Sequence, residues 1–142
     1  MMMRKALILL CTALFLGGCL EQPLKKPPQA EITIEGRRIS AVQGSYCWEE
    51  VCADAKYSSA FEAGTEIRPV EVPPGIRVKI RFPEEPDHLT VAQWTDEHSS
   101  SEVRMKDHAF AVPDKEGLYV YELSARWKEG DASFAFSVEV KE

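Results

Sequence analysis

The chain has 142 residues, of which 44% are hydrophobic and 28% are charged, and its 17 basic and 23 acidic side chains give a net charge of −6. This size and composition predict one small folded domain and exclude wholesale disorder. The acidic balance argues against nucleic acid as a partner, because phosphates require a basic surface.

The first eighteen residues have the pattern of a secretory signal peptide. Arg4 and Lys5 precede an apolar run over residues 6–16, and small residues follow it. This run is too short for a stable membrane-spanning helix, which needs about 20 apolar residues. Removal of residues 1–18 would leave 15 basic and 23 acidic side chains, a balance of −8.

The sequence Leu16-Gly17-Gly18-Cys19 resembles the lipobox of bacterial lipoproteins. The resemblance implies that Cys19 carries lipid on its sulfur and becomes the new N-terminus. It also implies a position on the outer face of the bacterial cytoplasmic membrane, or at an outer membrane if the source has one. The alternatives are an unprocessed membrane anchor or a chance Gly-Gly-Cys sequence. The membrane is therefore an expected partner, through the lipid on Cys19.

Residues 19–30 follow, rich in proline and without periodicity, which predicts an extended tether. Residues 31–142 are expected to form the folded domain, so the chain divides into 1–18, 19–30 and 31–142.

Strand signals begin the domain at residues 31–34 and 39–46. Among the four cysteines, Cys11 would leave with the signal peptide and Cys19 would carry lipid, so Cys47 and Cys52 remain. An oxidising environment outside the membrane favours a disulfide between them. The alternatives are a redox centre, which usually has two intervening residues rather than four, and a zinc site, which would need further ligands.

Tyr46 and Trp48 lie beside this expected bridge and are candidate binding residues. Tyrosine and tryptophan on a rigid loop are common anchors of binding surfaces. The alternative is that Trp48 belongs to the core together with Trp94 and Trp127.

The remaining elements are mostly short strands. Residues 58–63 predict one turn of helix, and weaker strands are expected at 67–72, 89–94, 102–106 and 110–112. The clearest strand is 76–82, where four apolar residues alternate with Arg77, Lys79 and Arg81. These basic residues could meet an anionic wall polymer or pair with acids across strands. A second alternating run at 119–127, followed by another at 134–140, predicts a C-terminal hairpin.

Seven to nine short strands separated by turn residues are typical of an all-β sandwich. The sequence Gly117-Leu118-Tyr119-Val120-Tyr121 resembles the tyrosine-corner region of immunoglobulin-like domains. The resemblance covers about the last 70 residues and implies an immunoglobulin-like antiparallel β-sandwich. Tyr121 stands where an antibody domain places its second cysteine, so the inter-sheet disulfide is not expected.

No set of residues indicates catalysis. His88, His98 and His108 recur every ten residues and would form a metal site only if their imidazoles met at one end of the sandwich; otherwise they are solvated turn residues. There is no Gly-x-Ser-x-Gly sequence and no phosphate-binding loop. We expect neither enzymatic activity nor a cofactor.

Two functions remain as hypotheses. The first is a non-enzymatic envelope module that binds a protein or a cell-wall polymer, in an oligomeric state that the sequence does not indicate. The second comes from Gly44-Ser45-Tyr46-Cys47-Trp48 and Ala125-Arg126-Trp127, which resemble chagasin-like cysteine-protease inhibitors. Those inhibitors insert loops into the protease cleft. Their Asn-Pro-Thr-Thr run, the proline between Arg and Trp, and the Gly-rich middle loop are absent here.

Overall fold

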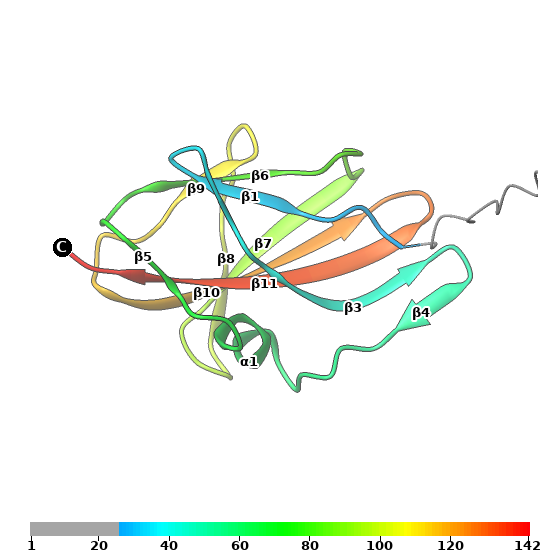
Figure 1. Ribbon diagram of the computed structural model, residues 1–142, viewed down its shortest axis with the longest axis horizontal. Helices are drawn as coiled ribbons and strands as arrows, with labels where there is room; N and C mark the ends of the chain where they lie inside the picture. The colour runs from blue at the N-terminus through cyan, green and yellow to red at the C-terminus, as the bar shows by residue number, and fades with distance from the viewer. Residues whose placement is uncertain (1–25) are drawn as a thin grey trace, which may run out of the picture.

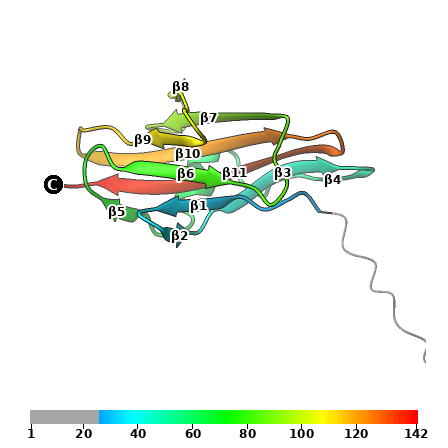
Figure 2. The ribbon, with the colours of Figure 1, turned by 90° about the horizontal axis from the view of Figure 1, so that it is seen from above.

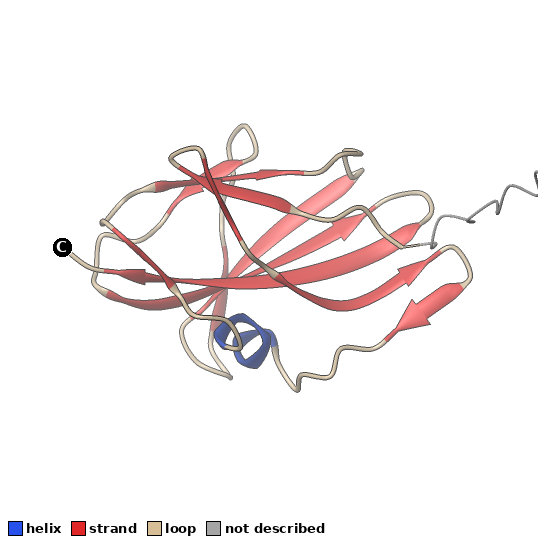
Figure 3. Ribbon diagram, viewed as in Figure 1, coloured by secondary structure: helices blue, strands red, loops and turns tan. Residues whose placement is uncertain are grey.

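Two β-sheets pack face to face in the computed structural model, which describes residues 26–142 (Figures 1 and 2). The lipobox and Cys19 lie outside the described residues. The strands are β1 (Glu31–Ile34), β2 (Arg37–Ile39), β3 (Val42–Trp48), β4 (Val51–Ala53), β5 (Val70–Val72), β6 (Arg77–Arg81), β7 (His88–Trp94), β8 (Ser100–Glu102), β9 (Ala109–Ala111), β10 (Gly117–Arg126) and β11 (Gly130–Val140). A short helix, α1 (Ala60–Thr65), lies on the larger sheet (Figure 3).

The smaller sheet has the strand order β2-β1-β6-β9, and the larger has β4-β3-β11-β10-β7-β8. The predicted all-β sandwich is therefore confirmed. Two details differ from the prediction: the described residues form eleven strands rather than seven to nine, and β5 pairs with the end of β11 in parallel.

The structure has more strands than predicted partly because one predicted strand is divided into two. The run predicted at 39–46 divides into β2 and β3, and β4 forms because the cysteine pair lies across a hairpin. The strand predicted at 102–106 was wrong for most of its length. β8 occupies Ser100–Glu102, and beyond it Lys106 forms only an isolated bridge with Ala109.

Strands β5 to β11 form an immunoglobulin-like core. In immunoglobulin domains one sheet contains strands C, F and G, extended by C′ in the variable type, and strands B and E lie in the other. In this protein the sheet that corresponds to C′-C-F-G contains β8-β7-β10-β11, and the strands that correspond to B and E are β6 and β9. The hydroxyl of Tyr119 donates a hydrogen bond of 2.8 Å to the carbonyl oxygen of Lys115, which is the contact of a tyrosine corner. The resemblance of the C-terminal half is thus borne out in the geometry, and β1–β4 extend both sheets.

The core follows the period-two pattern. On β6, Val78 and Ile80 are fully buried and the three basic residues are exposed, as predicted. At the centre the ring of Tyr121 stacks on Phe136, and its hydroxyl donates to Oε1 of Gln93 at 3.0 Å. Burial raises the pKa of the Tyr121 phenol, so it stays protonated and a donor.

An aromatic cluster closes one end of the sandwich. The ring of Trp127 meets Trp48 edge to face at 5.5 Å and Phe82 at 5.2 Å, and its indole N–H donates to the carbonyl oxygen of Glu84 at 2.9 Å. The described chain begins at the end that carries the β3–β4 and β10–β11 turns, whereas the C-terminus lies at the opposite end (Figures 1 and 2).

The last residues of the predicted tether lie against the domain. Pro27 is buried, Ala30 packs on the core, and the side-chain amide of Gln29 donates to the carbonyl oxygen of Pro27 at 3.1 Å. Pro27 and Ala30, at the end of the segment predicted as a tether, therefore contact the sandwich.

Candidate functional site

The predicted disulfide is confirmed: Cys47 and Cys52 are bonded across directly opposed positions of β3 and β4. The two candidate binding residues beside it are not exposed anchors. Trp48 is only 8% exposed and belongs to the aromatic cluster, and Tyr46 is half-buried against the core. The bridge thus fastens a hairpin whose aromatic side chains face inward.

Removing this bridge is expected to lower the free energy of unfolding by about 2 kcal/mol, because the closed loop is short. The test is urea unfolding of the protein with Cys47 and Cys52 both replaced by alanine, compared with the oxidised protein. Reductant should destabilise only the latter. Equal unfolding midpoints of the two proteins would show that the bridge does not stabilise the fold.

The three histidines are not brought together. His88 lies on β7 opposite Arg126, His98 lies in the β7–β8 loop, and Nε2 of His108 lies 3.2 Å from a carboxylate oxygen of Glu85. Within residues 26–142 no group of three or more His, Cys, Asp and Glu side chains is placed to hold a metal ion.

The residues that resemble the protease inhibitors do not project from loops. Residues 44–48 lie within β3, and Trp127, although in the β10–β11 turn, is 4% exposed.

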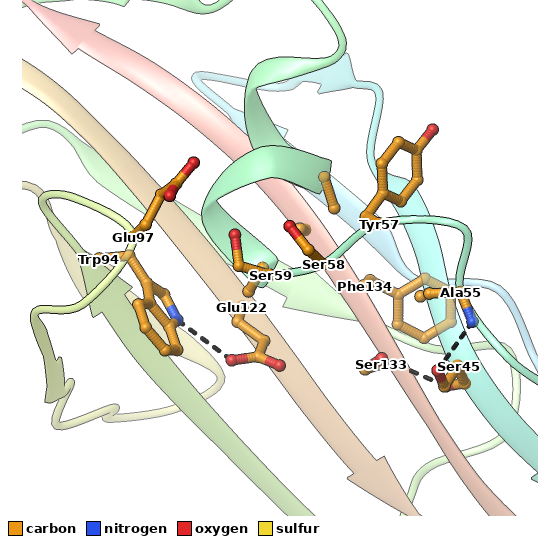
Figure 4. Close-up of a pocket in the computed structure, with 14 residues that line it drawn as sticks. Ser45, Ala55, Tyr57, Ser58, Ser59, Trp94, Glu97, Glu122, Ser133 and Phe134 are labelled. Carbon is orange, nitrogen blue, oxygen red and sulfur yellow. Dashed lines mark hydrogen bonds between the residues drawn. The ribbon is translucent and has the colours of Figure 1, made fainter.

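The outer face of the larger sheet carries a groove that sequence reasoning did not identify. Helix α1 crosses the outer face of the larger sheet, and a cavity of about 410 Å³ opens beside it (Figure 4). We call this the α1 groove. Its lining residues come from β3, β7, β10, β11, α1 and the two loops before α1 and after β7; they are Gly44, Ser45, Ala55, Tyr57, Ser58, Ser59, Ala60, Ala63, Trp94, Glu97, Glu122, Ser133, Phe134 and Ala135.

Small side chains on β3 and β11 form the floor of the groove. The hydroxyl of Ser133 donates to the carbonyl oxygen of Ser45 at 3.2 Å, and Oγ of Ser45 accepts from the backbone N–H of Ala55 at 2.9 Å. A Cβ on Gly44 would overlap Oγ of Ser133. These contacts hold the segment before α1 against the sheet, so the groove has a defined shape.

Two carboxylates give the groove its charge. Glu122 on β10 accepts a hydrogen bond of 3.1 Å from the indole N–H of Trp94 on β7 (Figure 4). Glu97 lies on the rim, in a loop where Oδ1 of Asp96 accepts from the N–H of His98 at 2.7 Å. That hydrogen bond lowers the pKa of Asp96. No Lys, Arg or His lines the groove.

Beside the rim, Lys56 is engaged elsewhere. Its ammonium lies 5.0 Å from the centre of the Tyr57 ring and 4.0 Å from a carboxylate oxygen of Glu66. The interaction with Tyr57 raises the pKa of Lys56. This cation therefore does not neutralise the carboxylates inside the groove.

Helix α1 is fixed at both ends. Oγ of Ser59, the N-cap, accepts from the N–H of Glu62 at 3.0 Å, and the Glu62 carboxylate accepts from the N–H of Ser58 at 2.7 Å. This is a variant of the capping box, whose S-x-x-E spacing is visible in the sequence. Gly64 at the other end lies so close to β10 that a Cβ would overlap Cγ1 of Val120.

The cap of α1 is expected to weaken in acid. Hydrogen bonds from Ser58 lower the pKa of Glu62 below its ordinary value of 4.5. The stabilisation is therefore fully present above pH 4.5 and is lost as the pH falls through the lower pKa of the folded state. The Ser58 amide resonance, followed by NMR, should shift in that range. In a Glu62→Gln variant the shift should vanish; a persistent shift would assign it to another group.

A second cavity of about 550 Å³ continues the groove across the sheet and shares Ser45 and Ser133 with it. Thr90 on β7 and Ser124 on β10 lie in the same row, because Ser124 is opposite both Thr90 and Ser133. The far end is lined by His88, Arg126 and Asp131. The two cavities together form a long, open channel with a floor of small polar residues.

Comparisons of the chain with protein-family models, with curated proteins and with solved structures find no match. No helix among residues 26–142 has the length and apolar character needed to cross a membrane.

Proposed function

We propose that the protein is a lipoprotein of the bacterial envelope, anchored through lipid on Cys19, and that its sandwich domain is a non-enzymatic binding module. The single observation that carries the binding role is the α1 groove. Its volume of about 410 Å³ lies within the range of ligand sites. It combines the aromatic side chains of Tyr57 and Trp94 with carboxylates and hydroxyls, which are the groups that orient a ligand.

The anchor is supported by the lipobox resemblance. Each methylene of an acyl chain contributes about 0.8 kcal/mol to membrane binding, so two chains hold a protein firmly. Confinement to the membrane surface raises the effective concentration of the domain for envelope partners. Helix α1, which borders the groove, lies on a broad side of the sandwich rather than at the end where the described chain begins, so anchoring leaves the groove accessible (Figure 1).

The side chains of the groove favour binding over covalent catalysis. No histidine or cysteine lines the α1 groove. Ser45, Ser59 and Ser133 bind backbone groups through their hydroxyls. The hydroxyl of Ser58 donates to the Glu62 carboxylate, which belongs to the helix cap and also accepts the backbone N–H of Ser58.

The anchor is tested by labelling cells with an acyl-chain analogue and separating the membranes. The protein should take up the label and sediment with the membranes, and a Cys19→Ala variant should do neither. Label on the Cys19→Ala variant would contradict the assignment of Cys19.

The binding role is tested by photo-crosslinking in intact cells. A photoreactive side chain at Tyr57, on the groove rim, should capture a discrete envelope component. The matched control places it at Thr33, on the outer face of the smaller sheet. Equal capture from both positions, or none from position 57, would contradict the assignment of the groove.

A further inference from the structure

The charge and shape of the α1 groove point to one class of ligand. We propose that it binds an extended peptide segment of a partner protein and that a lysine or arginine of that segment pairs with Glu122, while Glu97 on the rim adds to the negative charge. This inference rests on the proposed binding function and names the chemistry of its ligand.

The α1 groove carries negative charge. Glu97 and Glu122 line the groove without a basic residue, and Lys56 beside it is held on Tyr57. An anionic ligand would be repelled there, whereas a cation would be attracted. Glu122 is half-buried at the base of the groove, where the attraction is screened less than at the surface.

An aromatic side chain, Trp94, lies beside the Glu122 carboxylate. The Trp94 indole donates its N–H to Glu122, which fixes both side chains (Figure 4). A carboxylate next to an indole ring suits an amphipathic cation, because the alkyl stem of lysine or arginine packs on apolar surface and the charged head pairs with the carboxylate.

The continuation of the groove indicates an extended ligand. Because Ser45 and Ser133 line both cavities, one chain can occupy the two together. Their shared floor consists of small side chains across neighbouring strands, which allows a peptide backbone to approach the sheet. At the far end the lining contains Arg126 with Asp131 opposite it, so the channel is less negative there than beside Glu122.

The test uses the full-length protein in detergent micelles and octapeptide libraries that are randomised except for one fixed central residue. Libraries with fixed lysine or arginine should bind about tenfold more tightly than those with norleucine or glutamate, and added salt should reduce the difference. Equal binding of the lysine and norleucine libraries, or binding by none of them, would overturn the proposal.

Two variants test whether the cationic side chain of the peptide binds at Glu122. Glu122→Gln keeps an acceptor for the Trp94 N–H and removes the charge, and it should abolish the preference for lysine. Glu50→Gln makes the same charge change in the exposed β3–β4 turn and should have no effect. An equal loss in both variants would overturn the assignment to Glu122.

Two further probes separate other ligands. Acetyl-lysine amide, with a free ε-amine, should bind more weakly than the lysine library; equal affinity would overturn the extended-segment part. A neutral chitin oligosaccharide that binds and displaces the peptides would overturn the cationic ligand. If the peptides fail but position 57 still captures an envelope component, the binding function stands and only this inference falls.

Discussion

Replacing Trp127 with alanine is expected to lower the free energy of unfolding by about 3–5 kcal/mol. The side chain is 4% exposed, contacts Trp48 and Phe82 edge to face, and closes the end of the core. Its removal leaves a cavity between two rings and an unpaired carbonyl oxygen at Glu84, which now accepts the indole N–H.

Denaturant unfolding measures this loss. A Trp127→Phe variant keeps a ring in the cluster but loses the hydrogen bond, so it should fall between the alanine variant and the original protein. A loss of less than about 1 kcal/mol in the alanine variant would show that the surrounding rings collapse into the space.

Gly130→Ala is expected to lower the free energy of unfolding by about 3 kcal/mol. Gly130 begins β11 with φ of 156°, and a Cβ there would overlap the carbonyl oxygen of Cys47. That carbonyl belongs to the backbone of β3, next to the disulfide, so it cannot move aside as a flexible side chain would.

The matched control is Gly36→Ala in the β1–β2 turn. Gly36 also has positive φ, 76°, but no heavy atom lies within 4 Å of its added Cβ. Gly36→Ala loses only the ease with which glycine adopts positive φ, so the free energy of unfolding should fall by about 1 kcal/mol. Similar unfolding midpoints for the two variants would show that the close approach to Cys47 does not decide the effect.

The sequence predicted the elements in which one face is apolar and the other polar. The alternation on β6 and in the C-terminal hairpin predicts that these segments are strands and also which side chains face the core, because successive residues of a strand point to opposite faces of the sheet. The tyrosine corner was predictable for another reason: the hydroxyl of Tyr119 donates a hydrogen bond to the carbonyl oxygen of Lys115, which is only four residues away in the sequence.

The position of Trp48 was not decidable in this way. Tyr46 and Trp48 share one side of β3, and local sequence does not show whether that side meets the core. Trp48 packs on Trp127, which in turn contacts Phe82, and both of these residues come from strand ends far along the chain. The burial of Trp48 therefore follows from the packing of distant segments.

The α1 groove escaped prediction because its residues are individually unremarkable. Glu122 and Trp94 meet across two strands 28 residues apart, and the floor consists of serine, alanine and glycine. Two local signals were present. The Ser59-x-x-Glu62 spacing marks a helix start, and Gly64, which permits the helix to touch β10, marks a close approach.

The position of β11 has a mechanical consequence. This strand pairs with β10 along its full length, with β3 over its first half and with β5 near its end, and the chain leaves it at the end of the sandwich opposite to where the described chain begins. Tension applied between those two ends acts along the strands, so the ladders around β11 are loaded in shear and must break together rather than one bond at a time. The domain should therefore resist stretching along its long axis far better than it resists peeling of the β4 edge.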